Sequence, residues 1–124
     1  MKKKPQIFTS PFGGVKYALA LNQKQFKKAM KLLDVKDKQA YFLDNGADAQ
    51  VTWFEGGRKQ IVQLGSTEGI DPVAVVGLLA HESVHVWQAI RNYIGEKEPS
   101  REFEAYSIQR ILQDLLWSHK ELAE

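Results

Sequence analysis

The sequence contains no cysteine, which limits both how the chain can be cross-linked and how it could hold a metal ion. Disulfides and thiolate metal sites are excluded, so a metal ion would have to bind histidine and carboxylate ligands. No apolar run approaches the roughly 20 residues that cross a bilayer, so we expect no membrane-spanning helix. Met1 to Lys4 resemble the start of a signal peptide. Prolines and glycines then interrupt any apolar stretch, so we expect no signal peptide and a cytoplasmic location.

The size and composition predict one globular domain covering residues 1–124. The chain has 124 residues, of which 44% are hydrophobic and 26% charged, and it has no internal repeat or long linker. The net charge of +2 is unevenly spread, because residues 1–64 hold 12 Lys/Arg against 5 Asp/Glu and residues 65–124 hold 5 against 10. The basic half could face an anionic partner. Without interleaved aromatic residues, a solvated lysine face is favoured over nucleic-acid binding.

The first 46 residues predict a strand followed by a helix. Apolar residues alternate from Val15 to Leu21, which is typical of a half-buried strand. Asn22 is suited to cap a helix over Gln23 to Val35, with buried residues at helical spacing and lysines outside. Tyr41 to Leu43 predict a further short strand before a turn at Asp44-Asn45-Gly46.

The strongest hairpin signal lies around Gly56-Gly57. This pair suits a two-residue primed turn, in which both central residues have positive φ. Ala49–Glu55 and Arg58–Leu64 would be the two strands, with Glu55 facing Arg58. In this register, one face of the hairpin carries the side chains of Ala49, Val51, Trp53, Val62 and Leu64. We expect that face to be core and the opposite face to be wetter.

The second half predicts two helices. Asp71 and Pro72 fit the N-cap and first position of a helix running to about Ile94. This helix lacks a wide polar stripe, so we expect it to be a central helix enclosed by the rest of the domain. Ser100 is suited to cap a last helix over 101–118. The expected fold class is α+β: a short antiparallel sheet with a hairpin and an N-terminal helix within residues 1–66, and a helix pair at 71–118.

The motif that indicates chemistry is His81-Glu82-Ser83-Val84-His85. Histidines four positions apart share one face of a helix, so both imidazoles can reach the same ion. Glu82 is rotated about 100° from His81, where a carboxylate could contact a metal-bound water as a general base. This spacing predicts a Zn²⁺ site at His81 and His85 with Glu82 as the catalytic base.

A catalytic zinc site of this kind needs a third protein ligand. The candidates downstream are Glu96, Glu98, Glu102, Glu104, Asp114 and His119. Helical phase favours Glu104, which falls on the apolar stripe of the last helix, whereas Glu102 points away and suits the helix dipole. The alternative for Glu104 is an ion pair with Arg91 or Arg101. Gln88 could hydrogen-bond the second histidine, although solvation is the simpler expectation.

These residues resemble the gluzincin class of zinc metallopeptidases, in which a two-histidine helix is followed by a helix that supplies a glutamate ligand. His81, Glu82 and His85 match that motif, and Glu104-Ala105 is similar to the second-helix signature. Gln88 and Arg91 depart from the extended metzincin pattern. The segment from His81 to Gln88 with Glu104-Ala105-Tyr106 also resembles small proteins of tailed phages and prophages, which implies host cytoplasm or virion. The resemblance covers residues 71–118 and implies a minimal zincin-like domain.

Two functions follow as hypotheses. The first is a zinc peptidase, in which His81, His85 and Glu104 bind Zn²⁺ and Glu82 activates water against a peptide bond. The hairpin would offer an edge strand to a peptide or protein substrate. The second is a non-catalytic, zinc-stabilised phage structural or regulatory module that binds an anionic partner through its Lys-rich half.

Overall fold

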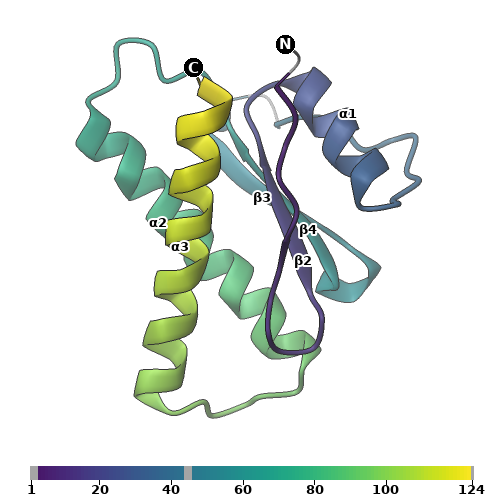
Figure 1. Ribbon diagram of the computed structural model, residues 1–124, viewed down its shortest axis with the longest axis vertical. Coiled ribbons are helices and arrows are strands. Elements are labelled where there is room, and N and C mark those ends of the chain that lie inside the picture. Colours follow the sequence, from purple (N-terminus) through teal and green to yellow (C-terminus); the bar gives the residue numbers. More distant parts are fainter. Residues whose placement is uncertain (1–2, 44–45, 124) are drawn as a thin grey trace.

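The computed structural model describes residues 3–43 and 46–123, which form three α-helices and a four-stranded sheet (Figure 1). The elements are β1 (Phe8–Thr9), β2 (Lys16–Ala20), α1 (Gln23–Leu32), β3 (Ala49–Phe54), the 3-10 turn η1 (Glu55–Gly57), β4 (Lys59–Leu64), α2 (Pro72–Tyr93) and α3 (Arg101–Ala123). The predicted α+β class is confirmed.

The sheet has the order β1-β2-β4-β3 and is mixed, whereas the sequence suggested an antiparallel one. β1 pairs with β2 and β3 with β4 in antiparallel fashion, but β2 and β4 run parallel, with Lys16 opposite Lys59 and Ala20 opposite Gln63. The chain between β2 and β4 passes through α1 and β3, and such a crossover is what a parallel pair requires.

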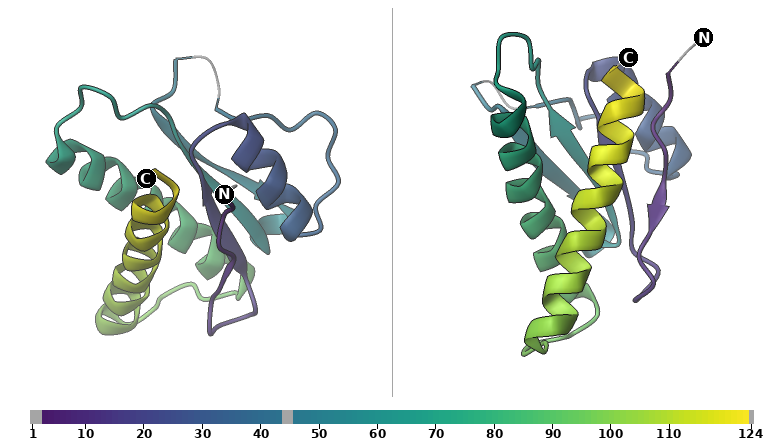
Figure 2. Two further views of the ribbon diagram at one scale, coloured as in Figure 1. Left: turned by 45° about the horizontal axis from the view of Figure 1, so that its top comes forward. Right: turned by 60° about the vertical axis from the view of Figure 1, so that its left-hand side comes forward.

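Both faces of the sheet are covered, so the expected half-buried strand and wetter hairpin face are wrong. Helix α1 lies on one side and helices α2 and α3 on the other (Figure 2). In β2, Tyr17 and Leu19 join the core under α2 and α3, while Ala18 and Ala20 join the core under α1. All four are at most 1% exposed. Small alanines on the α1 side let a helix pack where the alternation suggested solvent.

Helix α1 begins as predicted and ends slightly earlier. The Asn22 side chain accepts a hydrogen bond from the Gln25 N–H (2.8 Å), and a left-handed Asp34 (φ 56°) closes the C-terminus. The strand expected at Tyr41–Leu43 is wrong, because its N–H groups bond to side chains: that of Phe42 to Gln23 and that of Leu43 to Gln63. The turn predicted at 44–46 falls partly outside the described residues.

The hairpin has the predicted register, since Ala49 pairs with Leu64 and Phe54 with Lys59. Both glycines of the pair have positive φ, 70° at Gly56 and 96° at Gly57. The strands end one residue earlier than expected, because Glu55 also adopts a left-handed conformation (φ 54°) and begins η1.

The two C-terminal helices follow their predicted starts. Asp71 caps α2 by accepting from the Val73 N–H (2.8 Å), with Pro72 at the first helical position. Helix α3 continues five residues beyond the expected end at 118. The expectation of an enclosed α2 is wrong, because Val73 is 79% and Val76 is 42% exposed. The buried side of α2 packs on the sheet and α3, and its outer side is open.

Helix α2 is the segment that bears on the expectation of no membrane-spanning helix. With 22 residues it is long and apolar enough to meet the length and composition limits for crossing a bilayer. The described residues contain no other such helix. Its buried residues belong to the domain core, as in the core helix of a soluble protein.

Candidate metal centre

The two motif histidines meet on the outer face of α2. Their Nε2 atoms lie 3.2 Å apart, and their rings are inclined at 76° with centroids 4.8 Å apart. His81 is exposed and His85 is half-buried. Since α2 is regular from Pro72 to Tyr93, the i,i+4 spacing alone places both imidazoles one above the other.

The histidine pair fits a zinc ion. Zn–N bonds of 2.0–2.1 Å at a tetrahedral angle separate two ligand nitrogens by about 3.3 Å. The observed Nε2···Nε2 separation of 3.2 Å is close to that value. A cation between the rings would therefore require little rearrangement of either side chain.

Gln88 sets the tautomer of His85. Its side-chain Oε1 lies 3.0 Å from His85 Nδ1. An amide oxygen only accepts, so Nδ1 carries the hydrogen and the Nε2 lone pair of neutral His85 is turned toward His81. A partner on the far nitrogen is the usual support of a metal-binding histidine. The sequence suggested this role for Gln88 but favoured solvation.

Glu82 lies on the buried side of α2 and is 5% exposed. Burial raises the pKa of its carboxyl, and His81 and His85 oppose that rise when they are protonated. Among residues 3–43 and 46–123, no hydrogen bond or ion pair reaches this carboxyl. A buried acid that lacks a protein partner and sits beside two histidines is suited to holding a proton in a reaction.

Glu104 does not join the histidines in this arrangement. Its Oε2 accepts a hydrogen bond from Trp87 Nε1–H (2.8 Å) and lies 4.0 Å from Arg91 Nη1. Trp87 and Arg91 lie about 100–140° around α2 from the histidine face. Glu104 therefore contacts the Trp87 indole and Arg91, and Arg91 is one of the two arginines that the sequence offered as an alternative to a metal ion. In the described part of the chain, no three His, Asp or Glu side chains are placed to hold a metal ion.

The remaining candidates lie elsewhere. Glu96, Glu98, Glu102 and Arg101 are exposed. Asp114 accepts a hydrogen bond from the Tyr17 hydroxyl (2.5 Å) and lies 3.9 Å from Arg110 Nε. His119 is half-buried, and burial lowers its pKa. The structure therefore brings together His81, His85 and Gln88, with Glu82 adjacent, and leaves the other residues apart.

The contact that sequence reasoning missed is the one between Trp87 and Glu104. Trp87 packs in the core and is 1% exposed. A buried indole N–H nevertheless needs an acceptor. That requirement was the available signal for pairing Trp87 with a carboxylate on the neighbouring helix.

Comparison with known proteins gives no assignment: no family model, no curated protein and no solved structure matches the chain.

Proposed function

We propose that the protein is a zinc-dependent peptidase whose metal ion binds His81 and His85. The observation that carries the proposal is the pair of Nε2 atoms 3.2 Å apart, with His85 oriented by Gln88. The i,i+4 spacing brings the two imidazoles together, and the Gln88 contact turns the His85 Nε2 lone pair toward the space that a shared cation would occupy.

Glu104 is the proposed third ligand. Its side chain is 39% exposed and its partners are single contacts to Trp87 and Arg91. Binding the metal ion requires Glu104 to leave those contacts and reach the histidine face, which lies about 100–140° around α2 from Trp87 and Arg91. The charge of a divalent cation favours this exchange, because a carboxylate binds zinc more strongly than it binds a half-exposed arginine at 4.0 Å.

Glu82 supplies the proton chemistry. Zinc, when bound, makes a water molecule more acidic and polarises a carbonyl group. The carboxylate of Glu82 would accept a proton from the attacking water and donate it to the departing amine. Because burial raises the pKa of Glu82, its carboxyl holds a transferred proton more readily than an exposed glutamate would.

The substrate proposed is an extended peptide or protein segment. β3 is an edge strand within the described chain, and it packs against α2. An edge strand can pair with an extended peptide in the manner of an added strand. Trp53, 54% exposed on β3, would provide an apolar contact beside that peptide.

A non-catalytic, zinc-stabilised module is the second candidate, and one observation favours it. Six lysines line a single surface concavity beside α1: Lys3, Lys4, Lys24, Lys27, Lys28 and Lys31. Among the residues that the structure describes, no acidic side chain lines it, so this surface would attract an anionic partner. In either case we propose a location in the cytoplasm, in the host cytoplasm or virion if the chain is phage-encoded.

The first experiment is metal analysis of tag-free protein after equilibration with zinc. We expect one zinc ion per chain in the wild type and a large loss in His81→Ala and His85→Ala. Glu104→Ala should weaken zinc binding, whereas Glu102→Ala, an exposed glutamate on the same helix, is the matched control. Unchanged zinc affinity in Glu104→Ala would show that the third ligand is another group.

Catalysis is tested with Glu82→Gln and a peptide library. If the protein is a peptidase, this variant should keep its zinc and lose about 10²–10⁴-fold in turnover. An unchanged rate would refute the role of Glu82. Stoichiometric zinc with no cleavage by the wild type, together with anion binding that fails in lysine-to-glutamine variants, would support the second candidate instead.

A further inference from the structure

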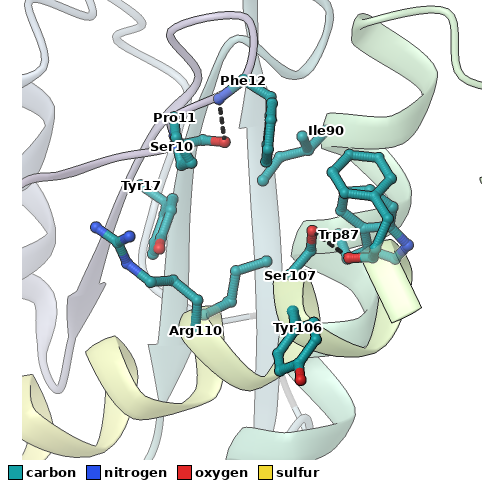
Figure 3. Close-up of a pocket in the computed structure, with 11 residues that line it drawn as sticks. Ser10, Pro11, Phe12, Tyr17, Trp87, Ile90, Tyr106, Ser107 and Arg110 are labelled. Carbon is teal, nitrogen blue, oxygen red and sulfur yellow. Dashed lines mark hydrogen bonds between the residues drawn. The ribbon is translucent and has the colours of Figure 1, made fainter. Parts of the chain in front are cut away.

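A second cavity, separate from the histidine pair, lies between the segment 10–17, α2 and α3 (Figure 3). Its volume is about 330 Å³. The inner wall is made by Tyr17, Trp87, Ile90 and Ile111, which are at most 3% exposed. Phe12 and Tyr106, 44% and 66% exposed, stand at its rim. The cavity thus has a buried floor and an accessible mouth.

The lining is mainly aromatic. Phe103 packs edge-on against Phe12 and Trp87, with centroids 4.8 and 5.3 Å apart. In Figure 3, Phe12, Tyr17, Trp87 and Tyr106 surround the central space. Aromatic walls bind planar rings through offset or edge-to-face contacts. A cavity of about 150 Å³ holds benzene, so about 330 Å³ accommodates a fused two-ring molecule.

The polar groups that line the cavity determine the charge and the hydrogen-bonding groups that a ligand should carry. Ser107 donates its hydroxyl to the Phe103 carbonyl (2.7 Å), and Tyr17 donates to Asp114. Arg110 lies 3.9 Å from Asp114 and its side chain is 61% exposed, so its charge is hydrated and the buried floor carries no unpaired charge. Ser10 accepts from the Phe12 N–H (3.2 Å), and its own hydroxyl hydrogen has no acceptor within residues 3–43 and 46–123. Tyr106 and Arg110 are exposed to solvent, so Ser10 is the buried donor in the described lining that remains for a ligand.

We propose that this cavity binds a small, uncharged, planar aromatic molecule of about two fused rings that presents one hydrogen-bond acceptor to Ser10. Such pockets, mainly apolar with a few placed polar groups, are the usual form of small-molecule sites. The wall uses none of His81, Glu82 or His85, and its link to the proposed zinc site is the Trp87 Nε1–H that bonds Glu104.

The test uses 2-acetylnaphthalene, which has two rings and one acceptor. Trp87 reports binding by its fluorescence in a Trp53→Phe/Trp117→Phe background, since both replaced tryptophans are more than half exposed and lie away from the cavity. We expect saturable one-to-one binding. The absence of saturable binding would overturn the proposal.

Two variants localise the ligand. Ser107→Phe places a ring in the cavity and should weaken binding about tenfold or more, because two groups cannot share the space. Gln109→Phe is the control, with the same substitution on an exposed position of α3, and should bind as the wild type does. If Ser107→Phe does not fold, as judged by circular dichroism, Ser107→Leu replaces it. Equal binding by the filled and control variants would overturn the proposal.

Ligand chemistry is tested by comparing related probes. Ser10→Ala should weaken the binding of 2-acetylnaphthalene about 2–10-fold, which is the usual contribution of one neutral hydrogen bond, and leave the affinity for naphthalene unchanged. The anion 2-naphthoate should bind more weakly than the ketone, because a charged group would lose its hydration without gaining an unpaired cation. Tighter binding of 2-naphthoate would contradict an uncharged ligand.

Discussion

Replacing Tyr17 by phenylalanine removes one hydroxyl group at the centre of the domain. Tyr17 lies on β2, is 1% exposed, and its hydroxyl donates to Asp114 on α3 over 2.5 Å. Its ring stacks on Phe8 with centroids 5.6 Å apart. Phenylalanine retains the ring and this stacking, so Tyr17→Phe isolates the hydrogen bond that ties the sheet to the last helix.

The expected loss is about 1.5–3 kcal/mol, the range for a hydrogen bond to a charged group. The lower half of that range is favoured, because the Asp114 side chain is 18% exposed and regains some water once its partner is gone. For a chain of 124 residues, this loss corresponds to a fall in Tm of roughly 5–10 °C. Tyr106→Phe, at a 66% exposed position, is the control and should change stability by less than about 0.5 kcal/mol.

The assay is urea unfolding followed by far-ultraviolet circular dichroism, with a double-mutant cycle that adds Asp114→Ala. A coupling energy near zero would refute the reasoning. The pH dependence gives a second check. Burial and Asp114 raise the pKa of Tyr17, so the folded state holds the phenolic proton more tightly than the unfolded state does. Wild-type stability should therefore fall as pH rises above about 10, and its advantage over Tyr17→Phe should shrink.

Three further predictions concern other parts of the molecule. Gln88→Ala should weaken zinc binding about 10–100-fold in a chelator competition, because the histidine ring loses its orienting partner; unchanged affinity would exclude that role. Burial lowers the pKa of His119, so stability should fall as pH drops below about 6.5, and His119→Gln should reduce that fall in urea titrations at several pH values. Gly13→Ala should lower the free energy of unfolding by about 1–3 kcal/mol more than Gly14→Ala does, as measured by thermal unfolding. Both residues have positive φ, but a Cβ at Gly13 would lie 2.6 Å from Ile94 Cγ2, whereas Gly14 faces open space.

Local signals in the sequence predicted local structure well. The Gly56-Gly57 pair fixed the hairpin register, and Asp71-Pro72 fixed the start of α2, because the backbone requirements of turns and helix ends depend on a few neighbouring residues. The i,i+4 histidine pair was predictable for the same reason. The distance between His81 and His85 follows from helix geometry alone.

Features that depend on tertiary packing were not predicted. Strand alternation at Ala18 and Ala20 looked like a solvent-facing side, because small apolar residues do not tell whether a helix covers them. Helical phase placed Glu104 on the side of α3 that faces the core, but phase does not give the rotation or height of α2 opposite it. The carboxylate consequently meets Trp87 rather than the histidines.

The parallel pairing of β2 with β4 has a consequence for the order of folding. Lys16 lies opposite Lys59, more than forty positions later, whereas β3 and β4 are joined by a turn of a few residues. Closing the long segment costs more chain entropy before any contact compensates for it. We therefore expect the β3–β4 hairpin to form early and the centre of the sheet to close late. Substitutions in β2 should then act mainly on the unfolding rate.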